Sequence, residues 1–214
     1  MGRLTAADLD AVTIDAFGTL VTLRDPVDAL RRTLRERGIE RRREEIAAAF
    51  AEEGRYYRDR SYEGADEASL ALLRRDCAEI FLRALDADLD PAEFAPAYVA
   101  TLEFEPVPGA PEAVAKLERL GLRLAVVSNW DVALPGYLRE LGLAAHFEAV
   151  VTSAEAGAPK PDPRIFELAL ERLGGVPPER ALHVGDSEAD ELGARAAGMA
   201  FAPAPLADLP ARLR

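Results

Sequence analysis

The sequence predicts an α/β fold: a doubly wound parallel sheet that carries one helical insertion. Short apolar, β-branched segments alternate along the chain with stretches of helical spacing;. Parallel neighbouring strands need a long crossover connection, usually a helix, so this alternation favours a parallel sheet with helices on both faces. One long stretch after the first apolar segment has helical spacing but no convincing strand, and we expect it to form the insertion.

Five segments are expected to form strands, because each is short, apolar and bounded by polar or turn residues. Helical patterns lie between them. The stripe that contains Ile165, Phe166 and Leu170, for example, stops at Gly174, as helices commonly do. The predicted strands span residues 9–14, 122–127, 149–151, 181–184 and, more weakly, 199–201.

We expect the chain to form two domains. Residues 1–21 and 106–214 are predicted to form a Rossmann-like core domain, and residues 22–105 a helical cap domain. The chain returns to the core through the turn-rich segment 106–109, Pro-Val-Pro-Gly;. Because the insertion leaves directly after the first strand, we expect it to cover the carboxyl edge of the sheet.

Composition narrows the range of partners. The 214 residues are 49% hydrophobic and 30% charged, and 26 Lys and Arg against 38 Asp and Glu give a net charge of −12. This charge repels phosphate backbones and anionic lipid, so we expect neither nucleic acid nor membrane as a partner. The single cysteine, Cys77, and the lack of an apolar amino-terminal stretch favour a reducing, cytoplasmic setting;.

Residues capable of chemistry follow the predicted strands, at the edge where open α/β sheets bind their ligands. Asp15 follows the first strand, and Gly18 allows the chain to turn sharply beside a ligand;. Ser128 and Asn129 follow the second strand and offer a hydroxyl and an amide to an anionic oxygen;. Taken alone, each of these residues could simply cap a turn or a helix.

Two further clusters follow later strands. Lys160, in the segment Lys-Pro-Asp-Pro, can serve as a point charge for oxyanions, although an exposed loop lysine is the ordinary alternative;. Asp186 and Asp190 lie four positions apart and can point to the same side of a helix, where they repel unless a cation lies between them;. Because the fold gathers strand ends, we expect these clusters and Asp15 to meet at one site.

The combination and order of these residues resembles the haloacid dehalogenase superfamily of hydrolases over nearly the whole chain, helical cap included. In that family the four motifs read Asp-x-Asp-Gly-Thr, a Ser or Thr, a Lys often followed by Pro, and Gly-Asp-x-x-x-Asp. The resemblance implies that Asp15 is the nucleophile of a covalent intermediate, while Ser128 and Lys160 hold the oxyanion. It also implies a Mg²⁺ ion whose ligands are Asp15, the backbone carbonyl of Phe17, Asp186 and, directly or one step removed, Asp190.

Phe17 departs from the phosphatase pattern. It replaces the second Asp of the first motif, which in phosphatases protonates the leaving oxygen, and phenylalanine cannot transfer a proton;. Such acid–base catalysis typically contributes about 10²- to 10⁴-fold, so an ordinary alkyl phosphate is expected to react slowly. The 2-haloacid dehalogenases of the same superfamily also carry an aromatic residue here, but they work without metal and lack part of the acidic fourth motif.

Three hypotheses therefore follow from the sequence. The leading one is a Mg²⁺-dependent hydrolase of a small phosphorylated metabolite, an anionic ester or anhydride, through an aspartyl-phosphate on Asp15. The three carboxylates support it, because a metal neutralises charge where a phosphoryl oxygen must dock and occupies the carboxylate that dehalogenation needs. The alternatives, both motivated by Phe17, are a 2-haloacid dehalogenase and a binding protein that turns nothing over.

Two residues near the predicted site receive no catalytic role. His183 lies inside the strand that precedes Asp186, and we expect its side chain to pack in or beside the sheet rather than act as a base;. Trp130 follows Ser128 and Asn129, and either lines the substrate entrance or packs against the cap.

Overall fold

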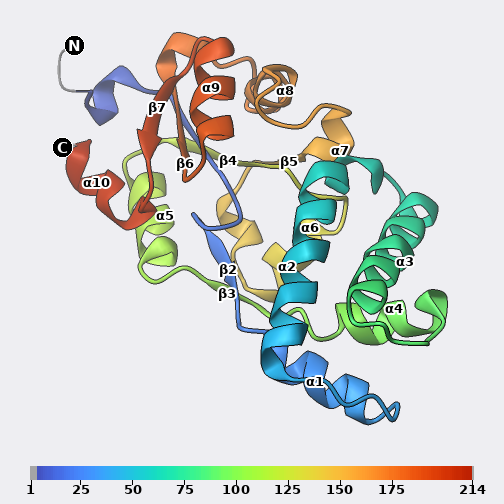
Figure 1. Ribbon diagram of the computed structural model, residues 1–214. Coiled ribbons are helices and arrows are strands. Elements are labelled where there is room, and N and C mark those ends of the chain that lie inside the picture. The colour runs from blue at the N-terminus through green and yellow to red at the C-terminus, as the bar shows by residue number, and fades with distance from the viewer. Residues whose placement is uncertain (1–3, 214) are drawn as a thin grey trace. The chain divides into compact units, whose positions relative to one another are not determined.

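A computed structural model describes residues 4–213 of the chain, which divides into two compact units. One unit consists of the chain up to Thr22 and from Glu105 onward, and the other of Leu23–Phe104. The first unit contains a parallel sheet flanked by helices (Figure 1). The predicted α/β fold with a doubly wound, Rossmann-like parallel sheet is therefore confirmed.

The sheet has five strands in the order β5-β4-β1-β6-β7, all parallel. At its centre, β1 pairs with β4 on one side and with β6 on the other, and its four side chains are fully buried. A strand buried on both faces favours apolar residues, and three of the four residues of β1 are apolar, with Thr13 the exception;. The strands are β1 (Ala11–Ile14), β4 (Arg123–Ser128), β5 (Ala149–Thr152), β6 (Ala181–Gly185) and β7 (Ala200–Pro203).

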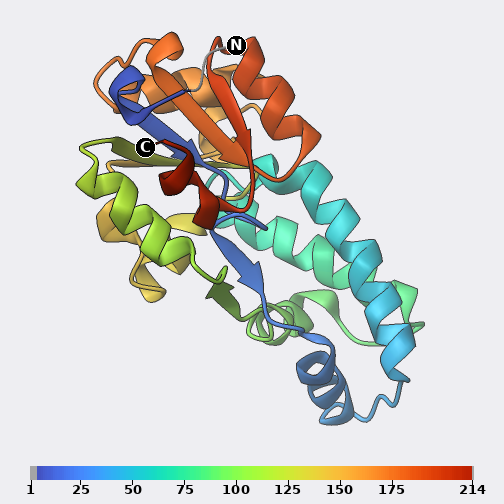
Figure 2. The same cartoon turned by 90° about the vertical axis from the view of Figure 1, so that its left-hand side faces the viewer.

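Helices cover the sheet (Figure 2). On one face, α8 and α9 pack on the sheet through a buried cluster that includes Val127, Val151, Ile165 and Ala194. The α5 helix lies on the other face and contacts α10 and β4. The helices of this unit are α5 (Ala110–Arg119), α6 (Leu134–Glu140), α7 (Ser153–Ala156), α8 (Arg164–Arg172), α9 (Glu188–Ala196) and α10 (Leu209–Arg212), with single 3₁₀ turns at Ala6–Asp8, Ala144–His146, Pro178–Arg180 and Leu206–Asp208.

All five predicted strands are present, and every strand end lies within two residues of the prediction. Two further strands, β2 (Val21–Leu23) and β3 (Phe104–Pro106), pair with each other where the chain passes between the units. They were not predicted, because three residues are too few to show an alternating pattern.

The second unit is helical. Its helices pack around a core that includes Leu30, Ile46, Phe81, Phe94 and Tyr98, with the rings of Phe81 and Tyr98 5.0 Å apart. No helix within residues 4–213 is long and apolar enough to span a bilayer. The helices are α1 (Val27–Arg35), α2 (Arg43–Arg60), α3 (Glu67–Ala84) and α4 (Pro91–Val99), with a 3₁₀ turn at Ser61–Glu63.

Candidate active site

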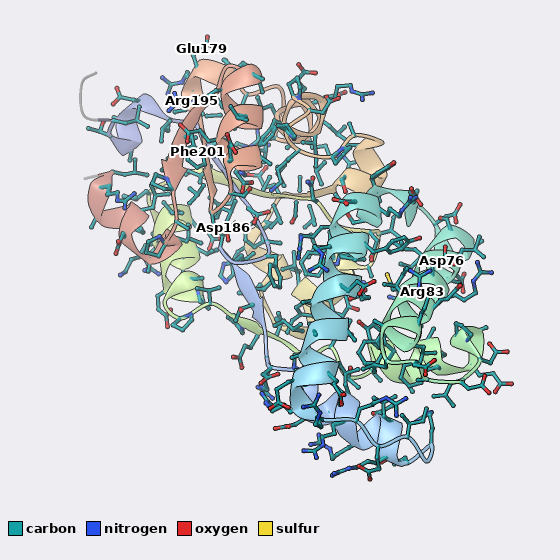
Figure 3. The ribbon with its side chains drawn as sticks, viewed as in Figure 1. Asp76, Arg83, Glu179, Asp186, Arg195 and Phe201 are labelled. Carbon is teal, nitrogen blue, oxygen red and sulfur yellow. The ribbon has the colours of Figure 1, made fainter. Side chains whose placement is uncertain are left out.

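The predicted site residues lie at the carboxyl edge of the parallel sheet. Asp15 directly follows β1, Ser128 ends β4, and Asp186 follows β6, as Figure 3 shows for Asp186. Lys160 lies in the loop between α7 and α8. Parallel strands point their carboxyl ends in one direction, so residues more than a hundred positions apart in the sequence come into contact.

Lys160 connects the acidic residues of the site. Its side chain is buried, and its ammonium donates to Oδ1 of Asp15 and to Oδ1 of Asp190, each at 2.5 Å. A third bond, to the backbone carbonyl of Val127, is 3.1 Å long. Ser128 Oγ also donates to Asp15 Oδ1, at 3.0 Å. All three ammonium protons therefore have acceptors, which fixes the position of the charge beside Asp15.

Asn129 holds the backbone of Lys160 in place. The backbone N–H of Lys160 donates to Asn129 Oδ1 at 2.7 Å, and Asn129 Nδ2 donates to the Lys160 carbonyl at 3.1 Å. These paired bonds tie the end of β4 to the loop before α8. An amide that was expected to face an anionic oxygen thus contacts the loop that carries the lysine.

The turn after Asp15 requires glycine at position 18. Gly18 has φ of +83°, and a Cβ atom built on it would lie 2.1 Å from Asp186 Oδ2. The turn is closed by backbone bonds from Gly18 N to the Val21 carbonyl and from Leu20 N to the Ala16 carbonyl. Only glycine both adopts this backbone conformation without strain and leaves room for the Asp186 carboxylate.

Three carboxylates form a group that could hold a metal ion. Asp15, Asp186 and Asp190 each offer a carboxylate oxygen, and these oxygens lie within 4.8 Å of one another. Hard divalent cations such as Mg²⁺ prefer oxygen ligands of this kind. One ammonium, from Lys160, faces the three carboxylates, so a divalent cation would balance the remaining charge. The residues present therefore fit the ion that the family resemblance implies.

Burial and neighbouring charges shift the pKa values of these groups. Burial raises the pKa of Asp15, and Asp190 raises it further, while Lys160 opposes the change. Burial lowers the pKa of Lys160, but Asp15 and Asp190 outweigh it, so the pKa lies above its ordinary value. Burial also raises the pKa of Asp186. An additional positive charge at this site would favour the ionised form of Asp15 that a nucleophile requires.

Asp190 is held by hydrogen bonds on both oxygens. Oδ1 accepts from Lys160 and lies 3.0 Å from His183 Nε2, and Oδ2 accepts from Ser187 N at 3.0 Å and from the Ser187 hydroxyl. Despite burial, these donors keep the pKa of Asp190 below its ordinary range, with His183 and Lys160 the main contributors. Asp190 is therefore an anion whose two oxygens both already have hydrogen-bond partners within the protein.

Ser187, Thr13 and His183 belong to this network but were not predicted as site residues. Ser187 caps α9 and donates to Asp190. Thr13 and His183 face each other across β1 and β6 and are fully buried. Two polar residues at one register position within otherwise apolar strands are the signal that could have identified them.

Phe17 and Trp130 lie beside the acidic residues. The Phe17 side chain is 50% exposed, and its ring lies 6.4 Å from that of Trp130, which is buried and contacts Tyr137. Phe17 therefore places an apolar surface two residues after Asp15, where the phosphatase motif has a carboxylic acid. This surface can pack against a substrate but cannot exchange a proton with it.

Comparisons with known proteins support one family. A family model described as haloacid dehalogenase-like hydrolase matches residues 9–198. The human haloacid dehalogenase-like hydrolase domain-containing protein 3 is 52% identical over 92 residues, which are 42% of this chain and 36% of that protein. A phosphoserine phosphatase of Thermus thermophilus is 44% identical over 97 residues, 43% of this chain and 37% of that protein. The matches thus span little more than a third of the length of these curated relatives.

Solved structures share the fold along most of the chain. L-2-haloacid dehalogenase from Xanthobacter autotrophicus, with chloropropionic acid covalently bound, has a TM-score of 0.70 at 24% identity, over 95% of this chain and 97% of that chain. A haloacid dehalogenase-type phosphatase from Thermococcus onnurineus has a TM-score of 0.57 at 27% identity, over 90% and 85%. The family match over most of the sequence, together with the site geometry, shows that the chain belongs to the haloacid dehalogenase-like hydrolases.

Proposed function

We propose that this hydrolase is a Mg²⁺-dependent phosphatase that acts on a small, anionic phosphorylated metabolite through an aspartyl-phosphate on Asp15. The observation that carries the proposal is the convergence of Lys160 and Ser128 on one oxygen of Asp15, at 2.5 and 3.0 Å. Relatives described as phosphoserine phosphatase, glyceraldehyde 3-phosphate phosphatase and phosphoglycolate phosphatase support the reaction class.

The roles of the residues follow from their contacts. Lys160 and Ser128 hold Oδ1 of Asp15 by hydrogen bonds, so the carboxylate cannot rotate freely. Its other oxygen, Oδ2, therefore keeps a fixed direction for the attack on phosphorus. Asp15 and Asp186 would hold Mg²⁺ directly with the Phe17 carbonyl, whereas Asp190, whose oxygens are both hydrogen-bonded, would act one step removed. The bound ion would neutralise charge on the phosphoryl oxygens.

The reaction has two steps. Asp15 attacks phosphorus, an O–P bond forms, and the bond to the leaving group breaks, so that the leaving oxygen departs with the electron pair. Water then attacks the phosphorus of the aspartyl-phosphate, the O–P bond to Asp15 breaks, and phosphate and a proton are released. Lys160 orients the Asp15 carboxylate in the first step and stabilises the negative charge that returns to it when the O–P bond breaks in the second;.

Phe17 limits the range of substrates. No acid at position 17 protonates the leaving oxygen, so a leaving group that is stable as an anion, such as the carboxylate of an acyl phosphate, is favoured;. Alkyl monoesters, whose leaving alkoxide needs a proton, are expected to react slowly. The preferred substrates would therefore be phosphate anhydrides and esters of acidic hydroxyls.

Phosphate release tests the proposal. Acetyl phosphate and p-nitrophenyl phosphate are incubated with the protein in Mg²⁺ and in excess chelator, and the Asp15→Asn variant provides the control. We expect release that needs both Mg²⁺ and Asp15. The proposal would be refuted if neither substrate released phosphate in Mg²⁺. It would also be refuted if the Asp15→Asn variant released phosphate as fast as wild type.

Phe17 also favours a second candidate, 2-haloacid dehalogenation. Here Asp15 would attack carbon, the carbon–halogen bond would break with release of halide, and water would hydrolyse the resulting ester. Chloride release from 2-chloropropionate in excess chelator distinguishes the two reactions. The acidic group of Asp15, Asp186 and Asp190 argues against dehalogenation, because a bound cation would occupy the carboxylate that must attack carbon.

A further inference from the structure

His183 is fully buried in β6, and both of its ring nitrogens have polar partners. Nδ1 lies 2.8 Å from the Thr13 hydroxyl, and Nε2 lies 3.0 Å from Asp190 Oδ1. The ring packs edge-on against Phe166, with the ring centroids 4.9 Å apart. The imidazole is therefore fixed both by packing and by two hydrogen bonds.

The partners determine which nitrogen carries the proton. Asp190 Oδ1 already accepts from the Lys160 ammonium, so it is an acceptor toward His183, and Nε2 must donate to it. A neutral imidazole has only one N–H, so Nδ1 accepts from the Thr13 hydroxyl;. The bonds then run in one direction, from Thr13 to His183 to Asp190.

The same carboxylate is one of the three acceptors that position the lysine ammonium. Asp190 Oδ1 accepts hydrogen bonds from Lys160 and His183, and Oδ2 accepts one from the Ser187 hydroxyl. Three residues therefore hold the carboxylate in place. The ammonium that contacts it is 2.5 Å from Asp15 Oδ1. A rotation of the Asp190 carboxylate would therefore move the charge that faces the nucleophile.

We propose that His183, as the Nε2–H tautomer fixed by Thr13, is a positioning residue that orients Asp190 and, through it, Lys160 against Asp15. This proposal rests on the proposed function of the same site. The hydrogen bonds of His183 go to Thr13 and Asp190 and not to Asp15, so its effect is on the alignment of the lysine. Outer-shell hydrogen bonds of this kind typically affect activity by about 10- to 100-fold.

Two substitutions at one position separate positioning from packing. His183→Leu keeps an apolar side chain beside Phe166 but donates no hydrogen bond, whereas His183→Gln offers an amide N–H near the place of Nε2. With acetyl phosphate in Mg²⁺, we expect His183→Leu to lower kcat by about 10- to 100-fold with KM changed by less than about threefold. His183→Gln should recover most of that loss.

Thr13→Val supplies an independent variant, because valine keeps the branched shape of threonine and suits a buried strand. It removes the hydroxyl that fixes the tautomer, and we expect a kcat loss smaller than that of His183→Leu. A folded His183→Leu protein with wild-type kcat would overturn the proposal. Equal losses in the Leu and Gln variants would also overturn it, because they would indicate packing alone.

NMR tests the tautomer without any turnover. The chain has two histidines, so long-range ¹H–¹⁵N spectra of the full protein contain two imidazoles, and His146→Gln assigns them. We expect His183 to show a protonated Nε2 and an unprotonated Nδ1 near neutral pH. A protonated Nδ1 in wild type would overturn the proposal. If no phosphate is released from any substrate, the proposed function fails, while this spectrum still tests the hydrogen bonds assigned to His183.

Discussion

Replacement of Phe17 by Asp tests whether the missing proton donor limits this enzyme. The backbone at position 17 pairs with Val21, and the turn is closed by the bond from Gly18 N to the Val21 carbonyl. The new carboxyl group would thus be attached to a backbone position that is held in place two residues after Asp15. We expect Phe17→Asp to accelerate the hydrolysis of alkyl phosphates, because their leaving oxygen needs a proton.

The substitution is expected to change the rate strongly and the stability of the fold only slightly. The Phe17 side chain is half exposed, and complete burial of a phenylalanine contributes about 1.5–3 kcal/mol, so its removal costs roughly 1 kcal/mol of stability;. General acid catalysis contributes about 10²- to 10⁴-fold, or roughly 3 to 5 kcal/mol of barrier. The variant should therefore remain folded and show a rate change large enough to measure.

The assay compares two substrates that differ in leaving group. In Mg²⁺, kcat/KM of Phe17→Asp for glycerol 2-phosphate should rise by about 10²- to 10⁴-fold, and that for acetyl phosphate by less than about tenfold. Phe17→Asn, which is similar in size to Asp but has no acidic proton, should show neither gain. An equal rise on both substrates, or no rise on glycerol 2-phosphate in a folded variant that still cleaves acetyl phosphate, would refute the reasoning.

Further predictions concern the metal site, the turn and the second unit. Removal of divalent cations by a chelator should abolish phosphate release, and added Mg²⁺ should restore it; release that persists in chelator would contradict the site. Gly18→Ala places a methyl group 2.1 Å from Asp186 Oδ2, so Mg²⁺-dependent turnover should fall at least about tenfold, and wild-type turnover would show that the turn relaxes freely;. Burial raises the pKa of Glu53, and a hydrogen bond with Cys77 lowers it only in part, so the folded state keeps its proton to a higher pH than the unfolded state. Wild type therefore loses stability as the pH rises from the pKa of Glu53 in the unfolded state through its higher pKa in the folded state;. Glu53→Gln should have a higher melting temperature than wild type at about pH 7 and an equal one at about pH 4, and the opposite order would contradict the assignment.

The sequence predicted the parts of the fold that depend on periodic apolar patterns. The β1 strand and α8 have long enough apolar patterns to be found, and the structure buries all of β1 and the apolar face of α8. The β2 and β3 strands were missed, because three residues carry no periodicity. Several strand ends also shifted by a residue or two, since they depend on local hydrogen bonds rather than on pattern;.

The site was predictable as a set of residues but not as a network. Asp15, Ser128 and Lys160 were expected together, and the structure brings them into direct contact. The bonds between Asn129 and the Lys160 backbone depend on loop geometry that no spacing rule encodes. His183 was expected to pack in the sheet and does so, but its contact with Asp190 depends on strand register.

The covalent intermediate on Asp15 tests the central claim most directly. Wild-type protein is mixed with acetyl phosphate carrying a radiolabelled phosphoryl group in Mg²⁺, quenched in acid, and digested to peptides. We predict label on the peptide that contains Asp15, and none in the Asp15→Asn variant or in chelator. Steady release of labelled phosphate with no label on this peptide, or label on another residue, would contradict the account.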